Sequence, residues 1–208
     1  MTFMNDSEKF KSLIKKALTM ISENYFKQPT VDAEKYKFGE RVFCYEFYHQ
    51  LRCLQDEFGR LEISGEAVKS CFQSTDLESN QTPDILIHNF GKHDNNEVII
   101  EVKTNENSFN NGIKKDFITL DKFTQTNSEF NYKIGISLIL NCDFKSILLN
   151  NKKLANDLKE IRKDNLRLEV WNIITPAYNE KKFLKEESII TYDFHKLNNV
   201  LNPIINSN

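Results

Sequence analysis

The chain alternates between stretches with apolar residues at every third or fourth position and stretches that are apolar almost throughout. The first pattern is typical of amphipathic helices, and the second is typical of strands covered on both faces. Near the start, Phe10, Ile14, Leu18 and Ile21 recur at helical spacing with lysines between them. The helical pattern predicts helices at residues 6–26, 39–58, 110–126 and 150–163.

Strand signals lie between these predicted helices. The runs DILIH, from Asp84, and EVIIEVK, from Glu97, are joined by the turn-like NFGKHDNN, which predicts a hairpin. Further strands are predicted at residues 60–65, 132–140 and 166–174, with an edge strand at 188–192. The polar residues 67–82 are expected to form a loop, and residues 198–208 a frayed end. This order of elements predicts an α/β fold with a mixed central β-sheet flanked by helices.

Length and charge narrow this picture. A chain of 208 residues with 39% hydrophobic content can bury one core, so we expect a single domain over residues 1–208. The 28 Lys and Arg against 30 Asp and Glu give a net charge of -2. The field of the whole molecule therefore does not attract a polyanion, and any nucleic-acid binding must be local.

Cysteine spacing and hydropathy predict the cellular compartment of the protein. Cys44, Cys53, Cys71 and Cys142 form no CxxC pair, and their wide spacings fit neither a zinc site nor a dense disulfide framework. The first residues lack the continuous apolar segment of a secretory signal, and no apolar run of about 18 residues occurs. We therefore expect a soluble, cytoplasmic protein with no membrane partner.

The hairpin carries an unusual group of charged residues. Glu101 and Lys103 are two positions apart on a strand, so both side chains point to the same face. Their neighbours along the strand are apolar, and burying an unpaired charge there is costly. Asp84 begins the neighbouring strand and is expected to meet Glu101 across the ladder. Two carboxylates this close repel unless a proton or a cation lies between them, and oxygen ligands suit Mg²⁺ or Mn²⁺.

These residues resemble the motif of the PD-(D/E)xK nuclease superfamily, which includes restriction endonucleases and repair nucleases. The resemblance rests on TPDILI, on the sixteen residues 85–100 that separate Asp84 from Glu101, and on EVK in an apolar strand. It spans about residues 38–142, with the N-terminal helix and a C-terminal helix-strand extension outside it. It implies a restriction endonuclease-like core of helix, three strands, helix and strand. It also implies that Asp84, Glu101 and the Val102 carbonyl hold Mg²⁺ or Mn²⁺, and that Lys103 is the catalytic lysine.

Many members of that superfamily add a glutamate from the first core helix. The segment GERVFCYEFYHQLR offers Glu40 and Glu46. Glu46 lies at the margin of the face marked by Phe43, Phe47 and Gln50, whereas an acid at a helix start is commonly explained by the helix dipole alone. We therefore favour Glu46 as the fourth catalytic residue and keep Glu40 as the alternative.

The resemblance implies a metal-dependent deoxyribonuclease, with a role in defence against foreign DNA or in restriction or repair. DNA is the expected partner, and because members this small often depend on partners, we also expect a homodimer or a partner subunit. The alternative is a catalytically inactive relative that binds nucleic acid or protein within a larger assembly. The sequence leaves open the specificity for the nucleic acid, DNA against RNA, and internal against end cleavage.

Overall fold

The structure is a computed structural model that describes residues 6–31, 36–66, 82–89, 96–104, 109–128, 130–163, 165–174 and 176–206. Almost all of the predicted loop at 67–82 and most of the turn of the predicted hairpin lie outside the described residues. All the predicted strands and helices fall largely or wholly within them.

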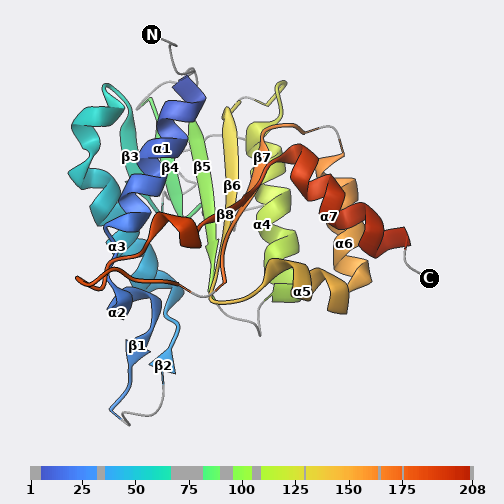
Figure 1. The fold of residues 1–208 in the computed structure, drawn as a ribbon. Helices are drawn as coiled ribbons and strands as arrows, with labels where there is room; N and C mark the ends of the chain where they lie inside the picture. Colours follow the sequence, from blue (N-terminus) through green and yellow to red (C-terminus); the bar gives the residue numbers. More distant parts are fainter. Residues whose placement is uncertain are drawn as a thin grey trace.

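A six-stranded mixed sheet forms the centre of the protein (Figure 1). Its strands lie side by side in chain order, with β3 and β8 at the two edges. β3 and β5 are each antiparallel to β4, which lies between them, β5, β6 and β7 are parallel, and β8 is antiparallel to β7. The strands are β3 (Glu62–Gly65), β4 (Ile85–His88), β5 (Val98–Lys103), β6 (Ile134–Leu140), β7 (Leu168–Ile173) and β8 (Ile190–Tyr192). The predicted mixed α/β architecture, the hairpin and the edge strand are confirmed.

Helices cover both faces of this sheet (Figure 1). One face packs against α1 (Asp6–Thr19), α2 (Glu23–Phe26) and α3 (Glu40–Cys53). The other packs against α4 (Phe109–Thr124), α5 (Phe144–Asn150), α6 (Lys152–Arg162) and α7 (Phe194–Asn206). Side chains of β5 alternate between the two apolar layers, because successive residues of a strand point to opposite faces of the sheet. Ile100 and Val102 belong to the first layer, and Ile99 belongs to the second. Residues of β5 therefore face α4 at every second position.

The central strands are almost completely enclosed. Every residue of β6 is buried, and in β5 only Lys103 is partly exposed. The close fit of α4 on the sheet depends on Gly135, where a Cβ atom would lie 2.8 Å from Leu168 Cδ2 and 3.0 Å from Thr124 Cγ2. Glu101 is consequently set inside a tightly packed layer.

The ends of several helices differ from the sequence predictions. The segment predicted as one helix over residues 6–26 is divided into α1 and α2, and the helix predicted over 39–58 ends at Cys53 and continues as the short 3-10 helix η1 (Gln55–Phe58). Gly59 follows with φ of 71°, a conformation that glycine adopts without strain. The helical stop at Gly59 was predicted, whereas the change of helix type was not.

The C-terminal region is ordered where fraying was predicted. Residues 194–206 form α7, and the prediction of a frayed end from residue 198 is wrong for the part that the structure describes. Leu197, Leu201 and Ile204 recur at helical spacing and are buried in the second layer. This apolar face contributes more than the many asparagines around it cost in helix propensity. A second unpredicted helix, α5, begins after Asp143, whose side chain accepts a hydrogen bond from the Lys145 N–H.

A small two-stranded extension projects from the first helical layer (Figure 1). It consists of β1 (Gln28–Pro29) and β2 (Tyr36–Lys37), which pair antiparallel between α2 and α3. We call the described residues 27–31 and 36–38 the arm. Gly39 joins the arm to α3 and lies against the Gln28 side chain so closely that a Cβ atom would be 2.7 Å from Gln28 Nε2.

Two further sequence predictions concern membranes and thiols. Among the described helices, none combines the length and the apolar composition needed to cross a bilayer. Cys44, Cys53 and Cys142 are free thiols, while Cys71 lies outside the described residues.

Candidate functional site

Asp84 and Glu101 meet across the β4–β5 ladder. The register pairs Ile85 with Ile100, so the next position places Asp84, directly before β4, opposite Glu101. The Val102 N–H donates to Asp84 Oδ2 over 2.7 Å, which fixes the orientation of that carboxyl group. Glu101 is 7% exposed, and the strand register sets it directly opposite Asp84. The expected meeting of the two acids across the hairpin is therefore what the structure shows.

Burial is the main cause of the unusual ionisation of both carboxyl groups. Burial raises the pKa of Asp84 to about 6, although the hydrogen bond from the Val102 N–H lowers it. Burial also raises the pKa of Glu101 well above its usual range, and the nearby charges of Asp116 and Asp84 add to this. Without a cation, the pair retains a proton that ordinary carboxylates would lose below pH 6.

Lys103 lies at the end of β5 between the two helical layers. Its Nζ atom is 3.4 Å from Asp116 Oδ2 on α4 and 3.6 Å from Glu40 Oε1 on α3. Burial alone would lower the pKa of Lys103, but the surrounding carboxylates together raise it above its usual value. The side chain is 14% exposed, so this ammonium group is held largely away from solvent. Lys103 thus remains a cation beside the carboxyl pair.

Glu40, and not Glu46, is the helix acid that contacts Lys103. Glu40 opens α3, whereas Glu46 lies further along and accepts a hydrogen bond from Gln50 Nε2 over 2.6 Å. The buried face of α3 is centred on Cys44 and Phe47 as well as Phe43. At about 100° per residue, Glu40 lies near the middle of that face, and Glu46 lies about 115° away from it. The preference for Glu46 therefore does not agree with the geometry of the helix.

Asp116 joins the cluster without having been predicted. It lies on α4, is 6% exposed, and its carboxylate faces the Lys103 ammonium group. Burial raises the pKa of Asp116 to about 7, although Lys103 lowers it. The spacing of α4 contained a signal, because position 116 is three residues after Ile113 and four before Leu120, both buried. An acid on the apolar face of a predicted helix is unusual enough to be singled out.

The cluster offers few ligands to a divalent cation. Within the described part of the chain, no three His, Cys, Asp or Glu side chains are arranged to hold one ion. Asp84 and Glu101 would therefore supply two carboxylates, and Mg²⁺ commonly takes only one or two from the protein, with water and phosphate oxygens as its other ligands. A cation between them would also replace the proton that the pair retains through its raised pKa values. The Val102 carbonyl as a third ligand remains an expectation from the resemblance.

Comparisons of the chain with models of protein families, with curated proteins and with solved structures find no match in any of the three. Function must therefore be argued from the cluster itself, made of Asp84, Glu101, Lys103, Glu40 and Asp116. Below we call these five residues the acid–lysine cluster.

Proposed function

We propose that the protein is a Mg²⁺- or Mn²⁺-dependent phosphodiesterase that hydrolyses DNA at the acid–lysine cluster. The observation that carries this proposal is the β4–β5 register, which sets the half-buried Asp84 opposite the buried Glu101, with Lys103 two positions further along β5. Two acids in a packed apolar layer destabilise a fold at neutral pH unless a ligand compensates for them. A catalytic role would explain why the two acids meet at this place, whereas packing of the core does not require them.

The order of elements supports the same proposal. From residue 40 to residue 140 the chain runs through a helix, three antiparallel strands, a helix and a strand parallel to the third. This is the order that the resemblance to the PD-(D/E)xK superfamily implies, and the restriction endonuclease-like core belongs to the proposal. The acids also occupy the positions that the resemblance implies, one before the second of these strands and one on the third.

The five residues of the cluster have three roles in the proposal. Asp84 and Glu101 would hold the cation, which supplies charge stabilisation for the phosphate and lowers the pKa of a bound water. Lys103, kept protonated by its acidic neighbours, places a positive charge where negative charge develops on the phosphate oxygens. Its raised pKa makes it a poor proton acceptor, so we assign it an electrostatic role. Glu40 and Asp116 position its ammonium group from two sides.

The reaction is a hydrolysis in which the water oxygen forms a bond to phosphorus as the bond to the leaving ester oxygen breaks. The water gives up one proton, and the leaving oxygen takes up one. The products are a phosphate monoester end and a hydroxyl end, and no oxidant or reductant is needed.

The alternative function is that of a non-catalytic binding subunit for nucleic acid or protein. The net charge of -2 favours this reading over a strongly cationic nuclease surface. The two readings differ in what they require of the carboxyl pair. A binding subunit has no use for a cation between Asp84 and Glu101, and a phosphodiesterase needs one.

Cation binding is the first test. Titration of the full chain with Mn²⁺ by calorimetry at pH 7.5 should show one binding event, which Asp84→Asn and Glu101→Gln abolish. Glu187→Gln, at a 74% exposed acid, is the matched control and should bind as the unchanged protein does. Equal binding by Asp84→Asn would mean that the ion is held elsewhere.

Cleavage is the second test. Supercoiled, linear and single-stranded DNA are each incubated with Mg²⁺ and one protein. The proteins compared are the unchanged protein, Asp84→Asn, Glu101→Gln, Glu187→Gln and Lys103→Ala. Cleavage should disappear in Asp84→Asn and Glu101→Gln and persist in Glu187→Gln. If no DNA form is cut, the proposal of DNA hydrolysis is rejected, and the binding-subunit reading replaces it where the carboxyl pair binds no cation either.

A further inference from the structure

Exposed apolar side chains are concentrated in one short part of the chain. Of the eight large hydrophobic residues that are well exposed in the described structure, five fall between residues 31 and 45. They are Val31, Tyr36, Phe38, Val42 and Tyr45. Single exposed apolar residues are normal, but Tyr36 and Phe38 are two residues apart on one projecting element, which indicates a binding surface there.

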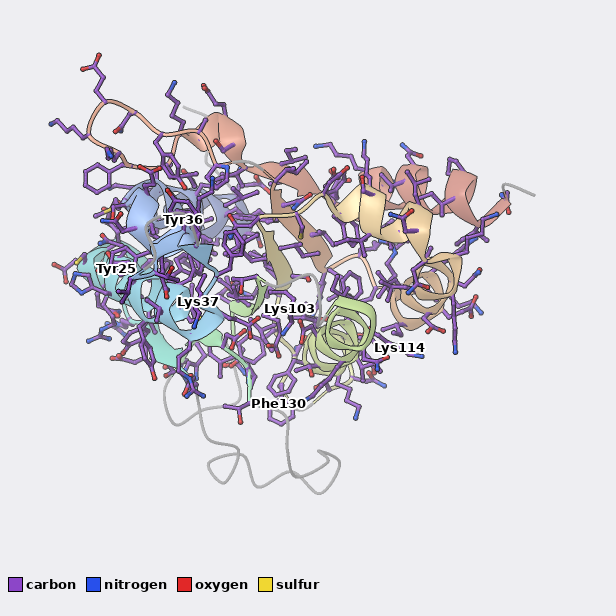
Figure 2. The ribbon with its side chains drawn as sticks, turned by 90° about the horizontal axis from the view of Figure 1, so that it is seen from below. Tyr25, Tyr36, Lys37, Lys103, Lys114 and Phe130 are labelled. Atoms are coloured by element: carbon purple, nitrogen blue, oxygen red, sulfur yellow. The ribbon has the colours of Figure 1, made fainter. Side chains whose placement is uncertain are left out.

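The arm lies next to the acid–lysine cluster along the chain. Tyr36 is four residues before Glu40, and Glu40 Oε1 is 3.6 Å from Lys103 Nζ. Figure 2, seen from below, shows Tyr36 and Lys37 on one side of Lys103 and Lys114 of α4 on the other. A strand that reached Lys103 from this side would therefore pass over the arm.

The arm combines its aromatic side chains with positive charge. Lys37 separates Tyr36 from Phe38 in the sequence, is exposed, and has no ion-pair partner among the described residues. Arg41, on the first turn of α3, is 72% exposed and pairs with Glu66 at the surface over 3.2 Å. A surface ion pair of this kind is weak, so a phosphate group of a bound strand can replace Glu66 as the partner of Arg41. Alternating aromatic and cationic side chains suit a nucleic-acid strand, whose bases stack while its phosphates meet the cations.

We infer that the arm binds a single-stranded stretch of nucleic acid, with bases stacked on Tyr36 and Phe38 and phosphates contacting Lys37 and Arg41. This inference rests on the proposed function and narrows its substrate to nucleic acid that is unpaired beside the cleaved bond. In a duplex the base faces are already stacked on one another, so aromatic side chains gain contact only with unpaired bases. A protein partner is the other occupant that exposed apolar residues suggest. Two observations favour nucleic acid over a protein partner. Lys37 has no ion-pair partner among the described residues, and Tyr36 is only four residues before Glu40 of the cluster.

The test compares two tyrosines of equal exposure. Tyr36 on the arm is 56% exposed, and Tyr45 on α3 is 57% exposed. At about 100° per residue, Tyr45 points about 140° away from Glu40 around the helix, so it does not line the proposed path. Fluorescence anisotropy measures binding of labelled oligothymidine of about 16 nucleotides and of the matching duplex. The full chain carries Glu101→Gln throughout, so that cleavage does not interfere.

Tyr36→Ala should weaken binding of the single strand about fivefold or more, the low end of what one stacked base contributes. Tyr36→Ala with Phe38→Ala should weaken it further, Tyr36→Trp should retain it, and Tyr45→Ala should leave it unchanged. Duplex binding should change little in all four. Light scattering on the same variants reports the number of copies in solution and should not change.

The inference is overturned if the double variant binds oligothymidine as the parent does, or if duplex binding falls by the same factor. It is also overturned if the arm variants lose a dimer that the parent forms, since the arm would then be a contact between copies. Failure here and failure of the proposed function are distinguishable. Normal cleavage with no dependence on Tyr36 rejects the inference alone, whereas Tyr36-dependent binding without any cleavage by the unchanged protein supports the arm and rejects the hydrolysis.

Discussion

Asp84→Asn should make the cation-free protein more stable at neutral pH while removing its cation site. The side chain is held by the Val102 N–H, and an asparagine oxygen can accept the same hydrogen bond. What the substitution removes is the negative charge in a half-buried position. The variant therefore isolates the cost of the charge from the loss of a contact.

The magnitude follows from the raised pKa. A change from the ordinary value of 3.8 to about 6 makes ionisation of Asp84 in the folded protein harder by about 3 kcal/mol. Because the folded pKa is raised, this group contributes stability fully below pH 4, and the contribution is lost as the pH rises through about 6. An asparagine is itself a buried polar group, so we expect a net gain of about 2 kcal/mol at pH 7.5. For a chain of this size that is a rise in Tm of about 4–8 °C.

The assay is urea unfolding in EDTA at pH 4 and pH 7.5. The unchanged protein should lose stability relative to Asp84→Asn between these two values, and Asp56→Asn, at an exposed acid, should follow the unchanged protein. Adding Mg²⁺ at pH 7.5 should then stabilise the unchanged protein and not Asp84→Asn. A variant that is no more stable than the parent at pH 7.5 in EDTA would refute the argument, because ionised Asp84 would then carry no cost in the fold.

Three further outcomes follow from the geometry. In a nuclease assay, Glu40→Gln should lower the cleavage rate about tenfold, because Glu40 contacts Lys103, whereas Glu46→Gln on the same helix should leave the rate unchanged. A loss of activity in Glu46→Gln and not in Glu40→Gln would instead favour Glu46 as the helix acid of the site. Asp116→Asn should lower the rate and keep Mn²⁺ binding by calorimetry, since Asp116 contacts the ammonium group; loss of the bound ion would instead make Asp116 a ligand. Gly135→Ala should destabilise the fold by about 1–3 kcal/mol in urea unfolding, because its Cβ atom would lie 2.8 Å from Leu168 Cδ2, and an unchanged midpoint would mean that α4 shifts freely.

The hairpin and the pairing of its two acids were predictable because side chains alternate strictly along a strand. Once Glu101 is on a strand of apolar residues, the face of Lys103 is fixed, and the spacing to Asp84 leaves few registers. The same certainty does not hold for α3. Including Gln50 among the residues of its buried face turned the predicted face toward Glu46, whereas burial of Cys44 centres the real face on Glu40. One residue more or less on this helical face rotates its centre by roughly 10–15°, and a margin position is therefore hard to assign.

The remaining features depended on tertiary contacts. The contact of Asp116 with Lys103 requires α4 to pack over β5. The order of elements suggests this packing, but the spacing of apolar residues in α4 does not specify which residue of α4 meets Lys103. The C-terminal helix was missed because residues near a chain end were expected to fray, although Leu197 and Leu201 mark a face that packs on the sheet. Terminal segments become ordered when such a face finds an apolar surface.

The two borders of the sheet bear on how copies of the protein could associate. β3 has four residues and β8 has three, and Glu62 and Ile190 are exposed at these borders. Outer strands this short present few unpaired backbone groups, so they are poor templates for joining two sheets into one. Assembly by continuous strand pairing is therefore disfavoured, and a homodimer would have to form through helices or through side chains.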